Sequence, residues 1–357
     1  MSVLQVGLGE RSYPITIESG CLRTVPEDLA TTYKASRYCI VADDTVAKLY
    51  GETLCSALQA VGLDCELIRF PHGEANKHLA TVGALASQAA QLGLDRKSMF
   101  IALGGGVTGD ITGFLAASYM RGVPLIQIPT SLLAQVDSSV GGKTGVDIPE
   151  GKNLVGAFYQ PKAVYIDPDV LKTLPEKEYI NGMGEVIKHG IIRDPAYFQM
   201  LSDKYDQVMA LDPQILQELI YVSCRIKSDV VAEDEEESNV RRILNFGHTI
   251  GHAVESASKF KIAHGFAVSI GMVAAARISV MKSLLTEAKV DEIINLLAKY
   301  QLPTEVPADL DRELIKSYLL TDKKRIGAKT SYILATDIGS VMITDEVSIA
   351  EIDAVLG

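Results

Sequence analysis

The chain has 357 residues, 47% of them hydrophobic, and a formal net charge of −11. Its length exceeds that of a usual single domain, so two packed domains with a large buried core are expected. An acidic chain is not built for general nucleic-acid binding, because phosphate backbones require a basic face. Any anionic small molecule that binds here must therefore meet a local cluster of cations.

The first twenty residues are interrupted by charged residues and a proline, and they lack a basic start followed by an apolar core. No signal or transit sequence is evident, so a cytoplasmic location is expected. The apolar stretch 266–285 is broken by Arg277 and Lys282, which favours a buried helix over a membrane span. Five cysteines without a C-x-x-C pair predict free thiols in a reducing compartment.

From about residue 36 the sequence alternates short apolar runs with amphipathic segments. This alternation is typical of βα units that build a parallel sheet. Strands are expected at Tyr38–Ala42, Cys65–Phe70, Met99–Leu103, Pro124–Ile128 and Ala163–Ile166, with helices at Thr45–Val61 and Leu79–Leu92.

Beyond Pro175 the strand signals fade and long helical patterns follow. These helices are expected at Ile180–Ile192, Pro213–Glu233, Thr249–Ser258 and Phe266–Leu285. The predicted fold class is α/β plus all-α: a Rossmann-like parallel-sheet domain over residues 1–174, followed by a mostly helical domain over residues 175–357.

A glycine-rich segment follows the strand that ends at Leu103, and Gly104, Gly106 and Gly109 in it have G-x-G-x-x-G spacing. Such a turn lets the backbone N–H groups of a helix N-terminus approach a dinucleotide pyrophosphate. The alternative is a tight turn that needs glycine for backbone reasons alone. The usual acidic residue about 20 positions further on is missing, so Asp43 or Asp44 is expected to contact the ribose.

The segment Gly141-Gly142-Lys143-Thr144 resembles the end of a phosphate-binding P-loop. Asp137 occupies the position of that motif's first glycine, which excludes the ATPase interpretation. The surrounding sequence is polar and rich in glycine, so a loop is expected. Lys143, together with Lys152 and Asn153 on the next loop, suits phosphate binding; the alternative is that these are exposed loop residues.

Three of the six histidines, His248, His252 and His264, lie close together in the second half. His248 and His252 are four residues apart, so on a helix they face one side. Thr249 excludes the H-E-x-x-H protease motif. A carboxylate such as Glu185 would complete a Zn²⁺ site with an open position for a substrate oxygen. The spacing leaves open which two histidines bind, and the alternative is that all three are core or surface residues.

Taken in order, these blocks resemble the 3-dehydroquinate synthases, a family of sugar phosphate cyclases. The resemblance extends from Asp43 to the Asp322–Lys324 segment. Its strongest blocks are Gly104–Asp110, Asp137–Gly145, Gly151–Phe158, Glu185–Lys188 and Asn245–His252. Departures are His189, where many relatives carry tyrosine, and the variant segment Asn181–Gly184.

The resemblance implies that Glu185, His248 and His264 hold Zn²⁺ or Co²⁺, which makes the second domain a metal-binding domain and leaves His252 for the substrate phosphate. It implies NAD contacts from Asp43, Glu74, Lys77, Gly105, Gly106, Asp110, Thr130, Ser131, Lys143, Lys152 and Thr173. It implies a substrate pocket that includes Asp137, Lys143, Lys152, Asn153, Lys188, Lys227, Glu237, Arg241, Asn245 and Lys324, the last preferred over Lys323. Arg121 would reach the phosphate in a neighbouring subunit, so a homodimer is implied.

The implied activity is that of a phosphate-eliminating carbon–oxygen lyase of the shikimate pathway. It converts 3-deoxy-D-arabino-heptulosonate 7-phosphate to 3-dehydroquinate by transient oxidation with NAD, loss of phosphate, re-reduction, ring opening and intramolecular aldol closure. Arg241 suits the substrate carboxylate through its planar fork, and Lys227 adds a point charge.

Three alternatives remain. One is a sugar phosphate cyclase whose substrate lacks a carboxylate, which Lys188, Lys227 and Arg241 argue against, because they would be buried cations without a partner anion. The second is a metal-dependent polyol dehydrogenase that uses NAD as a co-substrate. The third is a non-catalytic binding module that has kept the fold.

Overall fold

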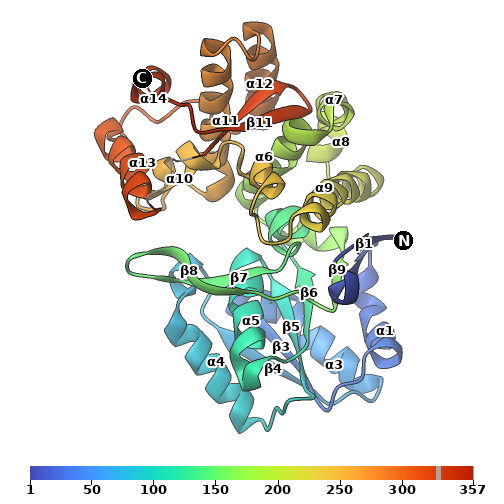
Figure 1. The fold of residues 1–357 in the computed structure, drawn as a ribbon. Coiled ribbons are helices and arrows are strands. Elements are labelled where there is room, and N and C mark those ends of the chain that lie inside the picture. Colours follow the sequence, from blue (N-terminus) through green and yellow to red (C-terminus); the bar gives the residue numbers. More distant parts are fainter. Residues whose placement is uncertain (327–330, 357) are drawn as a thin grey trace. The chain divides into compact units, whose positions relative to one another are not determined.

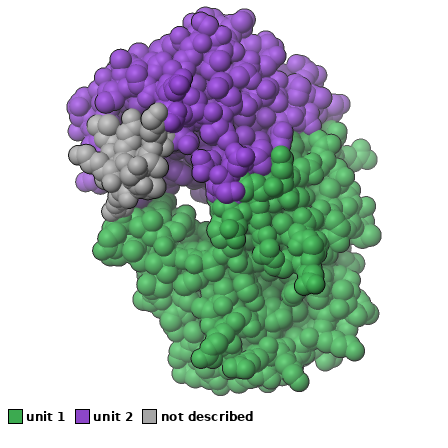
Figure 2. Space-filling model, in the orientation of Figure 1, with its two compact units in different colours: residues 1–174, 213–236 green, residues 175–212, 237–357 purple. Residues whose placement is uncertain are grey.

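The computed structural model describes residues 1–326 and 331–356, with no side chains described from residue 320 to 326. Two compact units are present (Figure 2): unit 1 comprises Met1–Leu174 and Pro213–Glu236, and unit 2 comprises Pro175–Asp212 and Glu237–Gly357. The predicted division assigned all residues after 174 to the second domain. Pro213–Glu236 belongs to unit 1 instead, because helix α9 (Pro213–Glu233) packs against strand β1 (Ser2–Val6) and the turn 134–138.

Unit 1 is built around a seven-stranded sheet with the order β1-β2-β9-β6-β5-β3-β4. All neighbouring strands are parallel except the edge pair β1–β2. The predicted parallel sheet is confirmed, and the sequence missed only the N-terminal pair. Besides β1, the strands are β2 (Tyr13–Ile17), β3 (Tyr38–Asp43), β4 (Cys65–Phe70), β5 (Met99–Gly104), β6 (Leu125–Pro129) and β9 (Ala163–Ile166).

Helices cover both faces of this sheet (Figure 1), which explains why its central strands are apolar throughout. Alternate residues of β3 point to opposite faces. Cys39 and Val41 pack toward α4 (Leu79–Gln91) and α5 (Gly106–Ser118), whereas Tyr38 and Ile40 pack toward α1 (Val25–Thr32) and α3 (Glu52–Ala60). The predicted helix 45–61 is less regular than expected: α2 (Asp44–Val46) leads into a π-helical turn, Ala47–Gly51, before α3 begins.

The segment predicted as a polar loop forms an antiparallel hairpin, β7 (Lys143–Ile148) and β8 (Gly151–Phe158). The loop prediction was wrong because tertiary contacts bury the start of this segment. Thr144 packs directly on Gly113 of α5, where a side chain would overlap the threonine methyl group. Gly145 lies opposite Gly156, so the two strands approach closely at a point without side chains.

Unit 2 is mostly helical, as expected, with one additional hairpin, β10 (Tyr332–Asp337) and β11 (Ser340–Thr344). Its helices are α6 (Glu176–Arg193), α7 (Pro195–Asp203), α8 (Tyr205–Met209), α10 (His248–Ala257), α11 (His264–Met281), α12 (Glu287–Lys299), α13 (Arg312–Ile326) and α14 (Ile349–Leu356). Among the described residues, α11 alone is long and apolar enough to cross a membrane, but 72% of it is buried inside the protein. It contacts α6, α10, α12 and α14, as expected for a core helix.

The five cysteines are free, and all but Cys55 are buried. Burial raises the pKa of Cys39 and of Cys224 to about 12. Their reactive thiolate forms are therefore scarce at pH 8 and increase only as the pH approaches that value. We expect a disulfide reagent at pH 8 to label the folded protein at Cys55 alone and the guanidinium-unfolded protein at all five cysteines. Rapid labelling of the folded protein at several sites would contradict this burial.

Candidate functional site

The glycine turn lies where the strand order of unit 1 changes sides: β4 lies on one side of β3, and β5 and the later strands lie on the other. Strand β3 pairs with β4 on one side and with β5 on the other. The carboxyl ends of β3 and β5 are therefore neighbours at a topological switch point, the position at which open α/β sheets bind ligands. Asp43 ends β3 and Gly104 ends β5, so the residues predicted to contact a dinucleotide flank this point.

Close packing explains why this turn uses glycine. A Cβ atom on Gly105 would lie 3.3 Å from the hydroxyl of Ser131, and one on Gly106 would lie 3.1 Å from that of Ser138. Helix α5 begins at Gly106, and no side chain caps its N-terminus. Its first N–H groups and the positive end of its dipole suit a phosphate. Thr130 adjoins the turn through a 2.9 Å backbone hydrogen bond that its N–H donates to the Gly104 carbonyl.

Asp43 is buried and also has a local structural role. Its Oδ1 accepts hydrogen bonds from the N–H groups of Thr45 at 2.8 Å and Val46 at 3.1 Å, which caps the helix that follows. The alternative residue, Asp44, is exposed. The structure therefore favours Asp43 as the acidic residue at the switch point.

A charged network connects the hairpin β7–β8 with the residues near the glycine turn. Lys77 Nζ lies 2.6 Å from Asp110 Oδ2 and 2.6 Å from Asn153 Oδ1. Lys152 Nζ lies 3.2 Å from Glu74 Oε1. Burial favours the neutral amine of Lys77, but Asp110 and Glu74 outweigh it and raise the pKa of Lys77. The network holds charged side chains of both predicted NAD and predicted substrate residues together in unit 1.

The loop before Lys143 is anchored by Tyr13, a buried residue of β2 that was not among the predicted site residues. The Gly141 N–H donates a 3.0 Å hydrogen bond to the Tyr13 hydroxyl. Replacing Tyr13 by phenylalanine removes this acceptor, so we expect a loss of about 1 kcal/mol in the free energy of unfolding, measured with denaturant. Replacing the exposed Tyr318 in the same way is the control, and an equal effect of both changes would contradict the anchoring role.

Asp137 precedes the same loop and pairs with Lys227 of α9. Lys227 Nζ lies 2.6 Å from Asp137 Oδ1 and donates a 2.7 Å hydrogen bond to the Asp137 carbonyl. Both residues were predicted for the substrate pocket. This pair adds to the contacts with β1 and the turn 134–138 that place α9 in unit 1.

In unit 2, Glu185 of α6 is fully buried and meets two histidines. Its Oε1 lies 3.3 Å from Nε2 of His264 and 3.5 Å from Nε2 of His248. This oxygen accepts no hydrogen bond, while the other carboxylate oxygen pairs with the buried Lys188. A buried carboxylate oxygen without a hydrogen bond, facing two imidazole nitrogens, is the arrangement that a cation completes.

The electrostatics of this group keep Glu185 ionised. Burial opposes ionisation, but Lys188, His248 and His264 outweigh it and hold the pKa of Glu185 well below its ordinary value. Burial and Lys188 lower the pKa of His248, so its ring is neutral and able to coordinate. Burial also favours the neutral form of His264, but the carboxylates of Glu185 and Glu255 outweigh it and raise the pKa of His264 to about 9.

The two distances from Glu185 fit a tetrahedral zinc or cobalt ion. Bonds of about 2.1 Å in a tetrahedral site place ligand atoms roughly 3.4 Å apart, and the two distances from Glu185 are 3.3 Å and 3.5 Å. A second group with ligand spacing, His252, Glu255 and His264, shares one histidine with the first. The first group is the more closed, because Glu185 is fully buried whereas His252 is exposed.

Comparison with known proteins places the chain in a family. The model described as "3-dehydroquinate synthase N-terminal" matches residues 67–181, and that described as "3-dehydroquinate synthase C-terminal" matches residues 182–325. The chain belongs to the 3-dehydroquinate synthase family. A 3-dehydroquinate synthase from Colwellia psychrerythraea is 47% identical over 349 residues, which cover 98% of each chain.

Two solved structures of related cyclases share the family's fold over almost the whole chain. A 2-deoxy-scyllo-inosose synthase, complexed with carbaglucose-6-phosphate, NAD⁺ and Co²⁺, has a TM-score of 0.91 at 29% identity and covers 99% of each chain. A 2-epi-5-epi-valiolone synthase from Streptomyces hygroscopicus, with NAD⁺ and Zn²⁺ bound, has a TM-score of 0.90 at 28% identity and covers 98% of this chain and 97% of that one.

The structure also explains the variant segment before Glu185 in this family member. The Gly265 N–H donates a 2.7 Å hydrogen bond to Asn181 Oδ1, and a Cβ on Gly184 would lie 2.6 Å from the Gly265 carbonyl oxygen. Asn181 and Gly184 therefore let α6 and the start of α11 touch, which brings Glu185 to His264. Sequence reasoning missed this role, because the partner is 84 residues away.

The remaining residues predicted for unit 2, apart from Lys324, lie within α10 or just before it. Asn245 donates a hydrogen bond to Glu237, so Glu237 belongs to this structured segment and is not merely part of a solvated acidic run. Arg241 is 2% exposed and His189 is fully buried. His252 lies beside the metal-ligand candidates, with its ring centroid 5.2 Å from that of His248.

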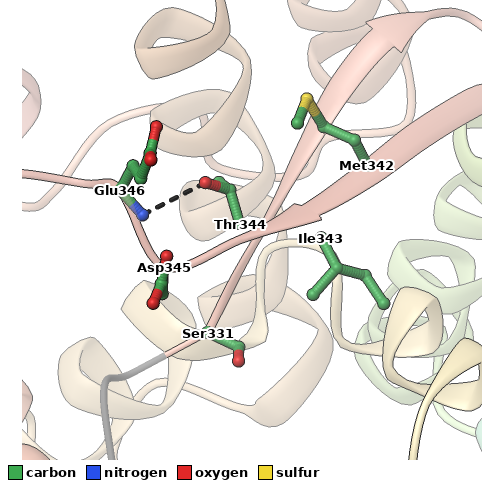
Figure 3. A pocket seen from close by; sticks show the side chains of 6 residues that line it. All are labelled: Ser331, Met342, Ile343, Thr344, Asp345 and Glu346. Atoms are coloured by element: carbon green, nitrogen blue, oxygen red, sulfur yellow. Dashed lines mark hydrogen bonds between the residues drawn. The ribbon is translucent and has the colours of Figure 1, made fainter.

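Some predicted residues lie neither near the glycine turn nor near Glu185, or are not described. Arg121 is exposed and follows Met120, and both have positive φ angles, 69° and 48°. Thr173 is exposed and contacts Tyr50 at 2.5 Å. The side chains of Lys323 and Lys324 lie outside the described residues. A shallow hollow beside β11, lined by Ser331, Met342, Ile343, Thr344, Asp345 and Glu346 (Figure 3), contains none of the predicted residues.

Proposed function

We propose that this chain catalyses the reaction of its family, the conversion of 3-deoxy-D-arabino-heptulosonate 7-phosphate to 3-dehydroquinate and phosphate. It would thus act as a phosphate-eliminating carbon–oxygen lyase of the shikimate pathway. Identity of 47% with a curated synthase over nearly the whole chain supports this reaction. The observation that carries the proposal is the convergence of Glu185, His248 and His264 on one point.

The cofactors that fit are NAD and a divalent zinc or cobalt ion. NAD would bind unit 1 at the switch point, through Asp43, Gly105, Gly106, Thr130 and Ser131, with Glu74, Lys77, Asp110, Lys143, Lys152 and Thr173 as further contacts. Glu185, His248 and His264 would hold the metal. When bound, NAD accepts and returns one hydride, and the metal polarises substrate oxygens.

Cations of the chain would hold a doubly anionic phosphate and a carboxylate despite the acidic total charge. Lys227 is oriented by Asp137 at 2.6 Å, so it offers a fixed positive charge. Lys188 balances Glu185 in the buried interior, which keeps the carboxylate ionised for the metal. Arg241 has a planar fork that matches the substrate carboxylate. Lys152, Asn153, Glu237, Asn245, His252 and Lys324 would complete the substrate contacts.

The test is turnover with substoichiometric NAD. The purified chain, Zn²⁺ and the heptulosonate phosphate are expected to release one phosphate per cyclic product, with no net NADH. Net accumulation of NADH would reject the cyclase in favour of a polyol dehydrogenase. Turnover of a hexose or heptulose phosphate, but not of the acid, would instead indicate a cyclase whose substrate lacks a carboxylate.

We also propose a homodimer in which Arg121 reaches the phosphate site of the neighbouring subunit, and a cytoplasmic location. The exposed position of Arg121 supports the first proposal, and the free thiols support the second. Light scattering of the purified protein measures the assembly. If Arg121 acts across a dimer, mixing the inactive Arg121→Ala and Lys188→Ala variants is expected to restore part of the activity, and a mixture that stays inactive would contradict this.

A further inference from the structure

His264 faces a carboxylate at each of its two ring nitrogens. Nε2 lies 3.3 Å from Glu185 Oε1, and Nδ1 lies 3.5 Å from Glu255 Oε2. A neutral imidazole has one N–H and one lone pair, so only one nitrogen can bind a metal while the other donates a hydrogen bond. What accepts that hydrogen bond decides which nitrogen remains available for the metal.

Glu255 lies where it can accept the hydrogen bond of His264 Nδ1 and so leave Nε2 available for the metal. It is 6% exposed and lies on α10, seven residues after His248 and three after His252, on the same helical face. Helix α10 approaches α11 closely at Gly251, where a Cβ would lie 2.9 Å from the carbonyl oxygen of Ala267. Helix α10 thus places both His248, a candidate metal ligand, and the buried Glu255 next to His264, the first residue of α11.

A buried carboxylate is costly unless it has a donor or a positive partner. The His264 N–H and the positive N-terminal end of α11 supply both at this position. Glu255 in turn fixes the ring with Nδ1 protonated and Nε2 directed toward Glu185. Carboxylate–histidine–metal arrangements of this kind orient the ring and increase its basicity as a ligand.

We infer that Glu255 is a positioning residue for the metal centre, which accepts the Nδ1–H of His264 and holds Nε2 toward the ion. The inference rests on the metal site of the proposed function. It differs from a direct role of Glu255 as a ligand together with His252 and His264, a grouping that their spacing also permits. In the inferred arrangement Glu255 never touches the ion, and the ligand set is unchanged without it.

The experiment uses the whole chain loaded with Co²⁺ and measures affinity and ligand field separately. Chelator competition at one pH gives the dissociation constant, and the visible spectrum at saturation reports the ligands. Glu255→Ala is expected to weaken Co²⁺ binding about 10–100-fold, as loss of an outer-shell partner does, with an unchanged spectrum. Glu255→Gln keeps an acceptor oxygen and is expected to recover most of the affinity.

The matched control is Glu351→Gln. It removes one carboxylate of unit 2 that pairs with Lys282 at 3.0 Å, far along the sequence from the candidate ligands, and Co²⁺ affinity should not change. Equal affinity of Glu255→Ala and wild type would overturn the inference, and so would a changed spectrum, which would make Glu255 a ligand. Circular dichroism confirms that each variant is folded.

The phosphate-release assay tests the proposed function separately from the Co²⁺ affinities that test the role of Glu255. Wild-type protein that binds Co²⁺ tightly but releases no phosphate from the heptulosonate substrate would reject the proposed reaction, while the affinities of the variants still decide the role of Glu255. Wild-type protein that binds no Co²⁺ would overturn both.

Discussion

Replacing His264 by alanine is expected to abolish metal retention and turnover together. The change removes one of two imidazole nitrogens that face the buried Oε1 of Glu185. Loss of metal polarisation is worth several kcal/mol at the transition state, so activity should fall by about 1000-fold or more. Metal analysis after dialysis and a phosphate-release assay measure the two effects.

NAD binding provides an internal check on this variant. The glycine turn and Asp43 belong to unit 1, whereas His264 belongs to unit 2, so the affinity for NAD should stay within about twofold, measured by fluorescence titration. His78→Asn is the control, because it removes a histidine that caps α4 and replaces it by a residue that also caps helices. A His264→Ala protein that keeps stoichiometric metal would disprove the assigned ligand set.

The predicted site residues form two clusters of different chemistry, one in unit 1 and one in unit 2. Unit 1 gathers the glycine turn and Lys77, which suit phosphates, together with Asp43, predicted for the ribose, and the Asp137–Lys227 pair, predicted for the substrate. Unit 2 gathers one acid and the histidines, which suit a divalent ion. The net charge of −11 is compatible with an anionic substrate, because a local group of lysines can attract an anion in a protein that is acidic overall.

The parallel strands and long helices were predictable because each depends on local pattern. Strands such as β5 are buried on both faces and read as continuous apolar runs. The hairpin β7–β8 was not predictable, because residues 144–146 of β7 become buried only through contacts with α5 and β8. The association of α9 with unit 1 depends on its packing against β1 and the turn 134–138, which local sequence does not encode.

In the candidate site, too, local spacing was predictable from the sequence, whereas contacts between separate helices were not. Helical spacing placed His248 and His252 on one face, but the choice of His248 with His264 came only from the family resemblance. The structure supports it through distances to Glu185, which lies on a separate helix. Glu255 was not selected, although it belongs to the same helical face, because its partner is on the next helix.

Gly265→Ala is expected to destabilise unit 2 strongly. A Cβ there would overlap the carbonyl oxygen of Asn181 and lie 2.9 Å from its carbonyl carbon. Backbone atoms cannot move aside as a flexible side chain can, so α6 and α11 must separate. We expect a loss of about 3 kcal/mol or more in the free energy of unfolding and a large drop in metal affinity, since the shift carries His264 away from Glu185.

Gly83→Ala is the matched control for the same chemical change. Gly83 lies inside α4 with nothing within 4 Å of an added Cβ, so alanine should stabilise the protein by about 0.5–1 kcal/mol through its helix propensity. Denaturant unfolding measures both variants, and chelator competition measures their metal affinity. If Gly265→Ala kept full stability and metal affinity, the close contact between α6 and α11 could not be what brings Glu185 and His264 together.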